Sequence, residues 1–133
     1  GAHGLKDSGF LVRKYADVDA KDVSGLTVPA SYKYLTDFET GVRYHMWHAL
    51  ALLGTALLMG RQPHAGLTIA AWCFTGGIVF FSGALYVLVI GGPRFAGVPW
   101  GMIAPIGGTL QLVGWARLGI SSLLLAKSSA AAG

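Results

Sequence analysis

The chain has 133 residues, of which 53% are hydrophobic and 12% are charged, whereas about a quarter of residues are charged in ordinary soluble domains. All six acidic residues precede residue 40, and the remainder carries five isolated basic residues. This distribution excludes the clustered basic face of a nucleic-acid-binding protein, so we expect no nucleic-acid partner, and the single basic residues are typical of membrane-flanking positions.

Residues 7–40 form a polar segment that we expect to lie outside the membrane. Because the chain begins with Gly rather than Met, we also expect a further segment upstream, either a signal peptide or a first span. Near the end of the polar segment, Thr36-Asp37-Phe38-Glu39 has the spacing of a capping box, and Glu39 precedes Arg43 by four residues. This pattern predicts a helix that begins near Asp37 and ends at Gly60.

Three apolar segments follow, at about residues 43–60, 66–90 and 101–126. The 26 residues from 65 to 90 carry no charge, which exceeds the roughly 20 residues needed to cross about 30 Å of hydrocarbon. Glycine and proline end the first two segments, at residues 60–63 and 91–93. The sequence therefore predicts an all-α integral membrane helical bundle over residues 41–127, with three transmembrane helices and a flexible tail at 128–133.

Aromatic residues near the predicted span ends support a membrane environment. If the spans alternate in direction, Tyr44, Trp47, Tyr86 and Trp100 fall near one interface, and Trp72 and Trp115 near the other. A guanidinium near a span end can extend to the interface. The predicted interface anchors are Tyr44, Trp47, Trp72, Trp100, Trp115 and Arg117.

Glycines within the apolar segments predict close helix packing, because they let helix backbones approach one another in lipid. Gly76 and Gly83 are seven residues apart, as are Gly107 and Gly114, so each pair lies on one helix face. We expect most of these contacts to lie within the bundle, with some facing another protein. The predicted packing residues are Gly54, Gly76, Gly77, Gly83, Gly107, Gly108 and Gly114.

Four stretches resemble a known family: GAHGLK at residues 1–6, YHMWHALALLG at 44–54, FSGALYVL at 81–88 and APIGGTLQLVGWARL at 104–118. They are similar to domain of unknown function 423, which includes animal transmembrane protein 256 and small bacterial inner-membrane proteins. The resemblance covers residues 1–6 and about 41–118. It implies a four-helix membrane protein in which residues 1–6 end a first span, or are its remnant, with the rest of that span upstream of residue 1. It implies no established activity.

Three histidines are candidate cofactor ligands. If residues 1–6 end a first span, His3 lies at the same membrane face as His45 and His48, which are about 60° apart around their helix. Three imidazoles at one depth can bind a metal, ligate haem or hydrogen-bond a quinone. The stronger interpretation is structural bonding between helices, because no acid or cysteine completes a site, and we expect no cofactor beyond contacts with lipid. Gln111 is likewise expected to bond a neighbouring helix, and His64 to face solvent.

No nucleophile, base and acid combine in the apolar region, so we expect no enzyme and no catalytic residues. The leading hypothesis is an accessory or scaffold subunit that packs against a larger membrane protein complex. The alternatives are a haem-, quinone- or metal-binding module that uses His3, His45 and His48, and a small transporter or channel component. The last is disfavoured because no span contains an acid to couple an ion.

We expect a multi-pass protein of a bacterial inner membrane. The Lys and Arg residues favour residues 7–40 on the cytoplasmic side, with seven on that side and three on the other. The resemblance implies the opposite orientation, with both termini inside. We expect residues 7–40 on the outer side.

Overall fold

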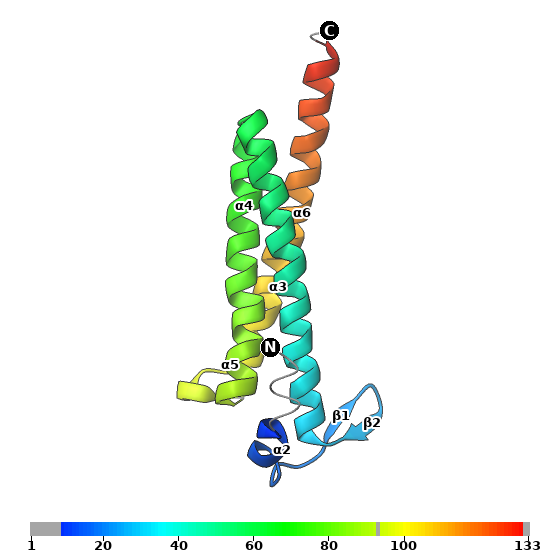
Figure 1. Ribbon diagram of the computed structural model, residues 1–133, viewed down its shortest axis with the longest axis vertical. Coiled ribbons are helices and arrows are strands. Elements are labelled where there is room, and N and C mark those ends of the chain that lie inside the picture. The colour runs from blue at the N-terminus through cyan, green and yellow to red at the C-terminus, as the bar shows by residue number, and fades with distance from the viewer. Residues whose placement is uncertain (1–8, 93, 132–133) are drawn as a thin grey trace.

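The computed structural model describes residues 9–92 and 94–131, and most of them are helical. Three long helical rods lie side by side, with a small folded segment at one end (Figure 1). The rods are α3 (Ala30–Arg61), the continuous run of α4 (Ala65–Gly77), the π-helix η1 (Ile78–Ser82) and α5 (Gly83–Gly91), and α6 (Trp100–Ala131). The end segment contains α2 (Phe10–Lys14) and the hairpin β1 (Lys21–Val23) and β2 (Leu26–Val28), and the 3₁₀ turn η2 (Phe95–Gly97) precedes α6. The all-α prediction is confirmed, and the hairpin was not predicted.

Helix α3 begins seven residues before the predicted start at Asp37. Pro29 occupies its N-cap position. Thr36, expected to cap the helix, instead donates its hydroxyl to the Tyr32 carbonyl within the helix, 3.1 Å away. A Lys33–Asp37 ion pair of 2.5 Å joins successive turns. The polar residues 30–40 are therefore the first turns of the same rod, because their side chains support a helix rather than start one.

The buried positions of α3 and α6 follow a seven-residue repeat. In α3 they include Tyr34, Gly41, His48 and Thr55. In α6 they are Ala104, Gly107, Gln111, Gly114 and Ser121. A spacing of three, four or seven residues keeps one helix face toward its neighbours. Because many of these residues are small, the helices approach closely.

The π-helix η1 interrupts the middle rod. The Gly83 amide donates to the Ile78 carbonyl, five residues earlier. The buried positions Phe74 and Gly77 are three residues apart, whereas the next buried position, Ser82, comes five residues after Gly77. The π-helix thus places one extra residue in the turn and changes which face of the rod meets the other helices.

The polar N-terminal segment packs against one end of the bundle. Tyr15 donates its hydroxyl to the Val89 carbonyl at 2.8 Å, and its ring lies 4.3 Å from that of Tyr34. Lys14 donates to the Ile90 carbonyl. Together with Leu11 and Leu85, these aromatic residues belong to a buried cluster that joins α2, α3, α5 and α6.

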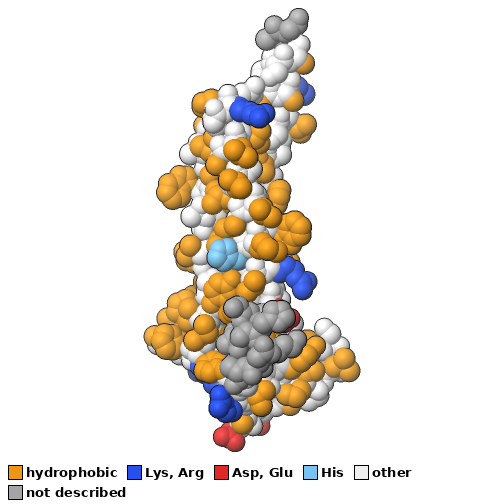
Figure 2. Space-filling model, in the orientation of Figure 1, with side chains coloured by type: hydrophobic (Ala, Val, Ile, Leu, Met, Phe, Trp, Pro, Cys, Tyr) orange, Lys and Arg blue, Asp and Glu red, His pale blue; other side chains and the backbone are white. Residues whose placement is uncertain are grey.

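Two of the described helical rods are long and apolar enough to cross a membrane, Ala65–Gly91 and Trp100–Ala131. Helix α3 does not meet that criterion, so length and composition support two of the three expected spans. Helix α6 also continues through Ala131, so residues 128–131 are helical rather than the expected flexible tail. The hydroxyls of Ser128 and Ser129 both donate to the Leu125 carbonyl within these last turns. Figure 2 shows apolar side chains along the visible face of the rods, with acidic side chains confined to the lower part.

Candidate functional site

Glycines bring α6 against the middle rod. A Cβ on Gly107 would lie 2.7 Å from the Phe80 carbonyl carbon and closer still to the Phe81 amide nitrogen. A Cβ on Gly114 would lie 2.9 Å from the Phe74 ring, and one on Gly77 would lie 2.5 Å from Gln111 Cγ. At Gly107 the two backbones are in direct contact, and at Gly77 and Gly114 a side chain of the neighbouring helix occupies the place of the missing Cβ.

The other predicted packing glycines differ in their surroundings. Gly76 faces Leu110 of α6 at 3.3 Å, and Gly108 faces the Phe81 ring at 3.7 Å. A Cβ on Gly54 or on Gly83 would meet no neighbouring helix within 4 Å in the described part of the chain. The sequence analysis missed other close contacts of glycines, which include Gly41 against Tyr86, Gly66 against Ser121 and Gly91 against Phe95.

His48 is buried between the three rods, and both of its ring nitrogens are hydrogen-bonded. The Nδ1 atom lies 2.8 Å from the Tyr44 carbonyl, which can only accept, so Nδ1 carries the proton. The Nε2 atom therefore accepts the indole N–H of Trp115, 3.2 Å away on α6. The ring also lies 5.9 Å from that of Phe74. Ligation of a metal or haem by His48 would require one of these bonds to break.

Of the candidate histidines in the described part of the chain, His45 and His48 contact different helices. His45 Nδ1 lies 3.2 Å from the Tyr86 hydroxyl on α5, whereas His48 contacts α4 and α6. His3 lies outside the described residues. Within residues 9–92 and 94–131, no three His, Cys, Asp or Glu side chains are close enough to hold a metal ion. His64, expected only to face solvent, accepts the Gly66 amide at 3.1 Å and caps α4.

A groove of about 410 Å³ lies beside His48, between α3 and α6. We call it the central groove. Its volume lies within the range of small-molecule pockets. The lining residues are Tyr44, His48, Phe81, Gly108, Gln111, Leu112 and Trp115.

Gln111, one of the residues that line the central groove, has a buried polar atom without a partner in the described part of the chain. The side chain is 3% exposed, and its Nε2 has no hydrogen-bond partner among the described residues. The expectation that Gln111 bonds a neighbouring helix is therefore not met here. The Ser82 hydroxyl, at the end of the π-helix, is also buried without a partner among those residues. Buried polar groups without partners are uncommon and often mark functional positions.

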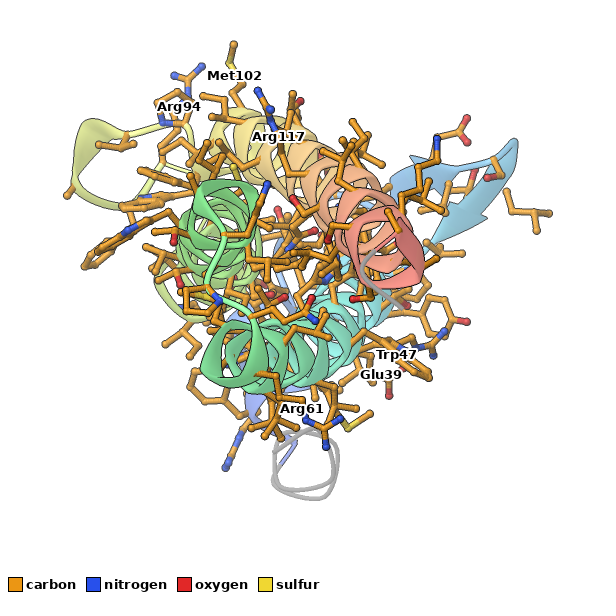
Figure 3. The ribbon with its side chains drawn as sticks, turned by 90° about the horizontal axis from the view of Figure 1, so that it is seen from above. Glu39, Trp47, Arg61, Arg94, Met102 and Arg117 are labelled. Atoms are coloured by element: carbon orange, nitrogen blue, oxygen red, sulfur yellow. The ribbon has the colours of Figure 1, made fainter. Side chains whose placement is uncertain are left out.

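The predicted interface anchors are mostly exposed. Trp47 is 60% exposed and Trp72 is 74% exposed, and Figure 3 shows Trp47 directed outward from α3 and Arg117 directed outward from α6. Trp100 donates its indole N–H to the Phe95 carbonyl at 2.9 Å. Trp115 bonds His48, the neighbour of Trp47. Trp47 and Trp115 therefore lie at similar heights rather than at opposite interfaces, because α6 is offset along the bundle relative to α3.

The fold defines a class: a small all-α helical bundle with helices that can cross a membrane and a groove between two of them. The family described as a protein of unknown function (DUF423) matches residues 1–108. The chain belongs to this family, as its motifs indicated. No solved structure matches the chain significantly.

The relatives are membrane proteins by name. A UPF0382 membrane protein of Staphylococcus saprophyticus is 39% identical over 74% of this chain and 78% of its own length. The UPF0382 membrane protein YwdK of Bacillus subtilis is 37% identical over 68% of this chain and 72% of its own. The UPF0382 inner membrane protein YgdD of Escherichia coli is 33% identical over 65% of this chain and 63% of its own. The chain is accordingly a small helical membrane protein.

Proposed function

We propose that this protein is a non-enzymatic subunit with three spans that packs laterally against a larger membrane protein complex in a bacterial inner membrane. Residues 44–60 of α3 carry no charge and extend about 25 Å at 1.5 Å per residue. This length supports α3 as the third span beside the two longer apolar rods.

The observation that carries the proposal is an open seam at the upper end of the bundle. The middle rod packs against both α3 and α6, whereas α3 and α6 make few direct contacts with each other. A hollow of about 300 Å³ separates their upper turns. We call it the upper seam, lined by Leu58, Arg61, Gln62, Ser122, Leu125, Ala126 and Ser129.

Glycines border the upper seam on both sides. Gly54 lies one turn before Leu58, and Gly119 lies three residues before Ser122, so each shares a helix side with a lining residue. Among the described residues, no atom lies within 4 Å of a Cβ placed on either glycine. Exposed glycine weakens a helix and gains nothing against lipid, but it lets a second helix approach closely. We infer that a helix of the partner subunit occupies the seam.

The hydroxyl groups of the spans support a structural role. Thr55 donates to the Ala51 carbonyl at 2.8 Å, Thr75 to Ala71 at 2.9 Å and Thr109 to Pro105 at 3.0 Å. These bonds to the preceding turn are ordinary for threonine in a membrane helix. They leave these hydroxyls occupied by their own backbone.

The test is purification of the full-length protein from its native membrane in mild detergent, followed by native mass analysis. We expect a membrane protein to co-purify in a fixed ratio with the wild type. Gly54→Leu and Gly119→Leu should each reduce its recovery by roughly tenfold, about 1.4 kcal/mol, because the leucine fills the approach path. Gly83→Leu is the matched control, since Gly83 also faces open space but lies away from the seam.

Two results would contradict the proposal. One is a wild-type protein that is a stable monomer without a co-purifying protein. The other is equal recovery in all three variants. A mass of two copies of this chain would identify a homodimer instead of a subunit of a larger complex.

A further inference from the structure

The central groove combines three features that neither the packing of the bundle nor the proposed partner explains. It has room for a small molecule, its walls are largely aromatic, and a buried amide nitrogen of Gln111 lacks a partner among the described residues. A hydrogen-bond donor buried without a partner costs free energy, and a ligand that accepts its hydrogen removes that cost. We propose that the central groove binds the ring of a membrane quinone, with Gln111 donating to a ring carbonyl.

The walls fit a planar ring. The ring centroids of Tyr44 and Phe81 lie 4.9 Å apart, and the Trp115 indole also lines the groove. The bond from Trp115 to His48 Nε2 fixes the indole in position. Gly108 keeps the groove open, because a side chain at that position would extend into it. Aromatic faces favour stacking with a flat partner.

The Gln111 amide nitrogen is buried, and a rotation of the side chain would turn it toward a ligand in the groove. The stem of Gln111 rests over Gly77, and the last torsion of a glutamine side chain turns easily. His48 is not the donor in this arrangement, because both of its nitrogens are used in the bonds to Tyr44 and Trp115. The site is therefore distinct from a histidine-ligated cofactor.

The lining of the groove distinguishes an uncharged quinone ring from a charged lipid headgroup. No charged side chain of the described residues lines the groove, so a charged headgroup would be buried without a counter-ion.

The experiment uses the full-length protein in phosphatidylcholine nanodiscs, with ubiquinone-1 as the probe. The reporter protein carries Trp47→Phe, Trp72→Phe and Trp100→Phe, so its fluorescence comes from Trp115 alone. A quinone stacked beside Trp115 quenches that fluorescence. We expect saturable quenching, weakened at least about tenfold by Gln111→Leu, which removes one hydrogen bond. The matched control is Gln62→Leu at the upper seam, which should leave the affinity unchanged.

A second variant keeps the test independent of any effect of Gln111 on folding. Gly108→Leu, checked for an unchanged helical spectrum, should abolish saturable quenching by filling the groove. Quenching that never saturates, or that is equal in the Gln111→Leu and Gln62→Leu proteins, would overturn the proposal. Equal displacement of the probe by dioleoylglycerol would also overturn it and assign the groove to an acyl ester. The upper seam is not involved, so the result is separate from the partner test.

Discussion

At the scale of single residues, two neighbouring glycines of α6 differ in the space available for a side chain. A Cβ on Gly107 would meet the backbone of Phe80 and Phe81, which cannot move without separating two helices. We expect Gly107→Ala to lower the stability of the bundle by about 1–3 kcal/mol through overpacking. Gly108→Ala, with its nearest neighbour at 3.7 Å, should leave stability unchanged or raise it by up to about 1 kcal/mol through helix propensity. Thermal unfolding in detergent, followed by circular dichroism, compares the two, and equal midpoints would refute the close contact.

Tyr15 gives a prediction for pH. Burial, with a smaller effect of Tyr34, raises the pKa of Tyr15 from 10.0 to about 12. Because the folded pKa exceeds the unfolded one, the protonated phenol stabilises the docked segment fully below pH 10. That contribution falls between pH 10 and pH 12, as the hydroxyl that donates to Val89 ionises.

Phenolate absorbance near 295 nm, measured for the wild type and Tyr15→Phe, tests the raised pKa of Tyr15. The difference between the two should titrate near pH 12 in the folded protein. Proteolysis of the segment around α2 should increase over the same range in the wild type. A difference that titrates at pH 10 would show that Tyr15 is not buried against the bundle.

The histidines show how far the contacts of a single side chain can be predicted from the sequence. Spacing places His45 and His48 about 60° apart on one helix, and this was enough to expect bonding to neighbouring helices. It was not enough to tell which helix each one meets. His48 falls on the buried seven-residue repeat with Gly41 and Thr55, whereas His45 falls beside it and reaches Tyr86. The neighbours are set by the order of the three rods, which no local pattern contains.

At the scale of elements, the apolar segments were predictable and their boundaries were less so. The hydrophobic runs locate the three rods, because the length and apolar composition of a run can be taken directly from the sequence. The capping-box pattern at residues 36–39 misplaced the start of α3, because the same residue types also stabilise a helix interior through the Lys33–Asp37 pair. The hairpin had a usable signal: Ser24-Gly25 forms its two-residue turn with positive φ at both positions. The π-helix had no such signal, since its residues Ile78–Ser82 do not differ in type from the helical residues around them.

The glycines likewise show that a local sequence pattern predicts a shared helix face but not the helix that this face meets. Gly107 and Gly114 were expected on one face, and they share the face that meets the middle rod. Gly76 and Gly83 were expected to share a face, but the π-helix lies between them. Gly83 consequently faces open space, while Gly76 faces Leu110.

At the scale of the whole molecule, the arrangement of the rods decides what each end of the bundle meets. The hairpin and η2 lie at one end, and the α3–α4 connection at residues 62–64 lies at the other (Figure 1). If all three rods span the membrane, these two ends lie on opposite sides. If α3 lies on one surface instead, the hairpin and residues 62–64 share a side.

Single cysteines in a Cys73→Ala background separate the two arrangements. Ser24→Cys in the hairpin turn should react with a membrane-impermeant maleimide added to intact spheroplasts, which places the N-terminal segment on the outer side. Gln62→Cys should react only in inverted vesicles. Leu53→Cys, at an exposed position in the middle of the apolar part of α3, should react in neither, because the proposed third span places it in lipid. The reverse pattern at Ser24 and Gln62 would keep three spans and invert the orientation, as the positive charges favour. Labelling of both positions from one side, together with a reactive Leu53→Cys, would mean that α3 does not cross the membrane and that the bundle has two spans.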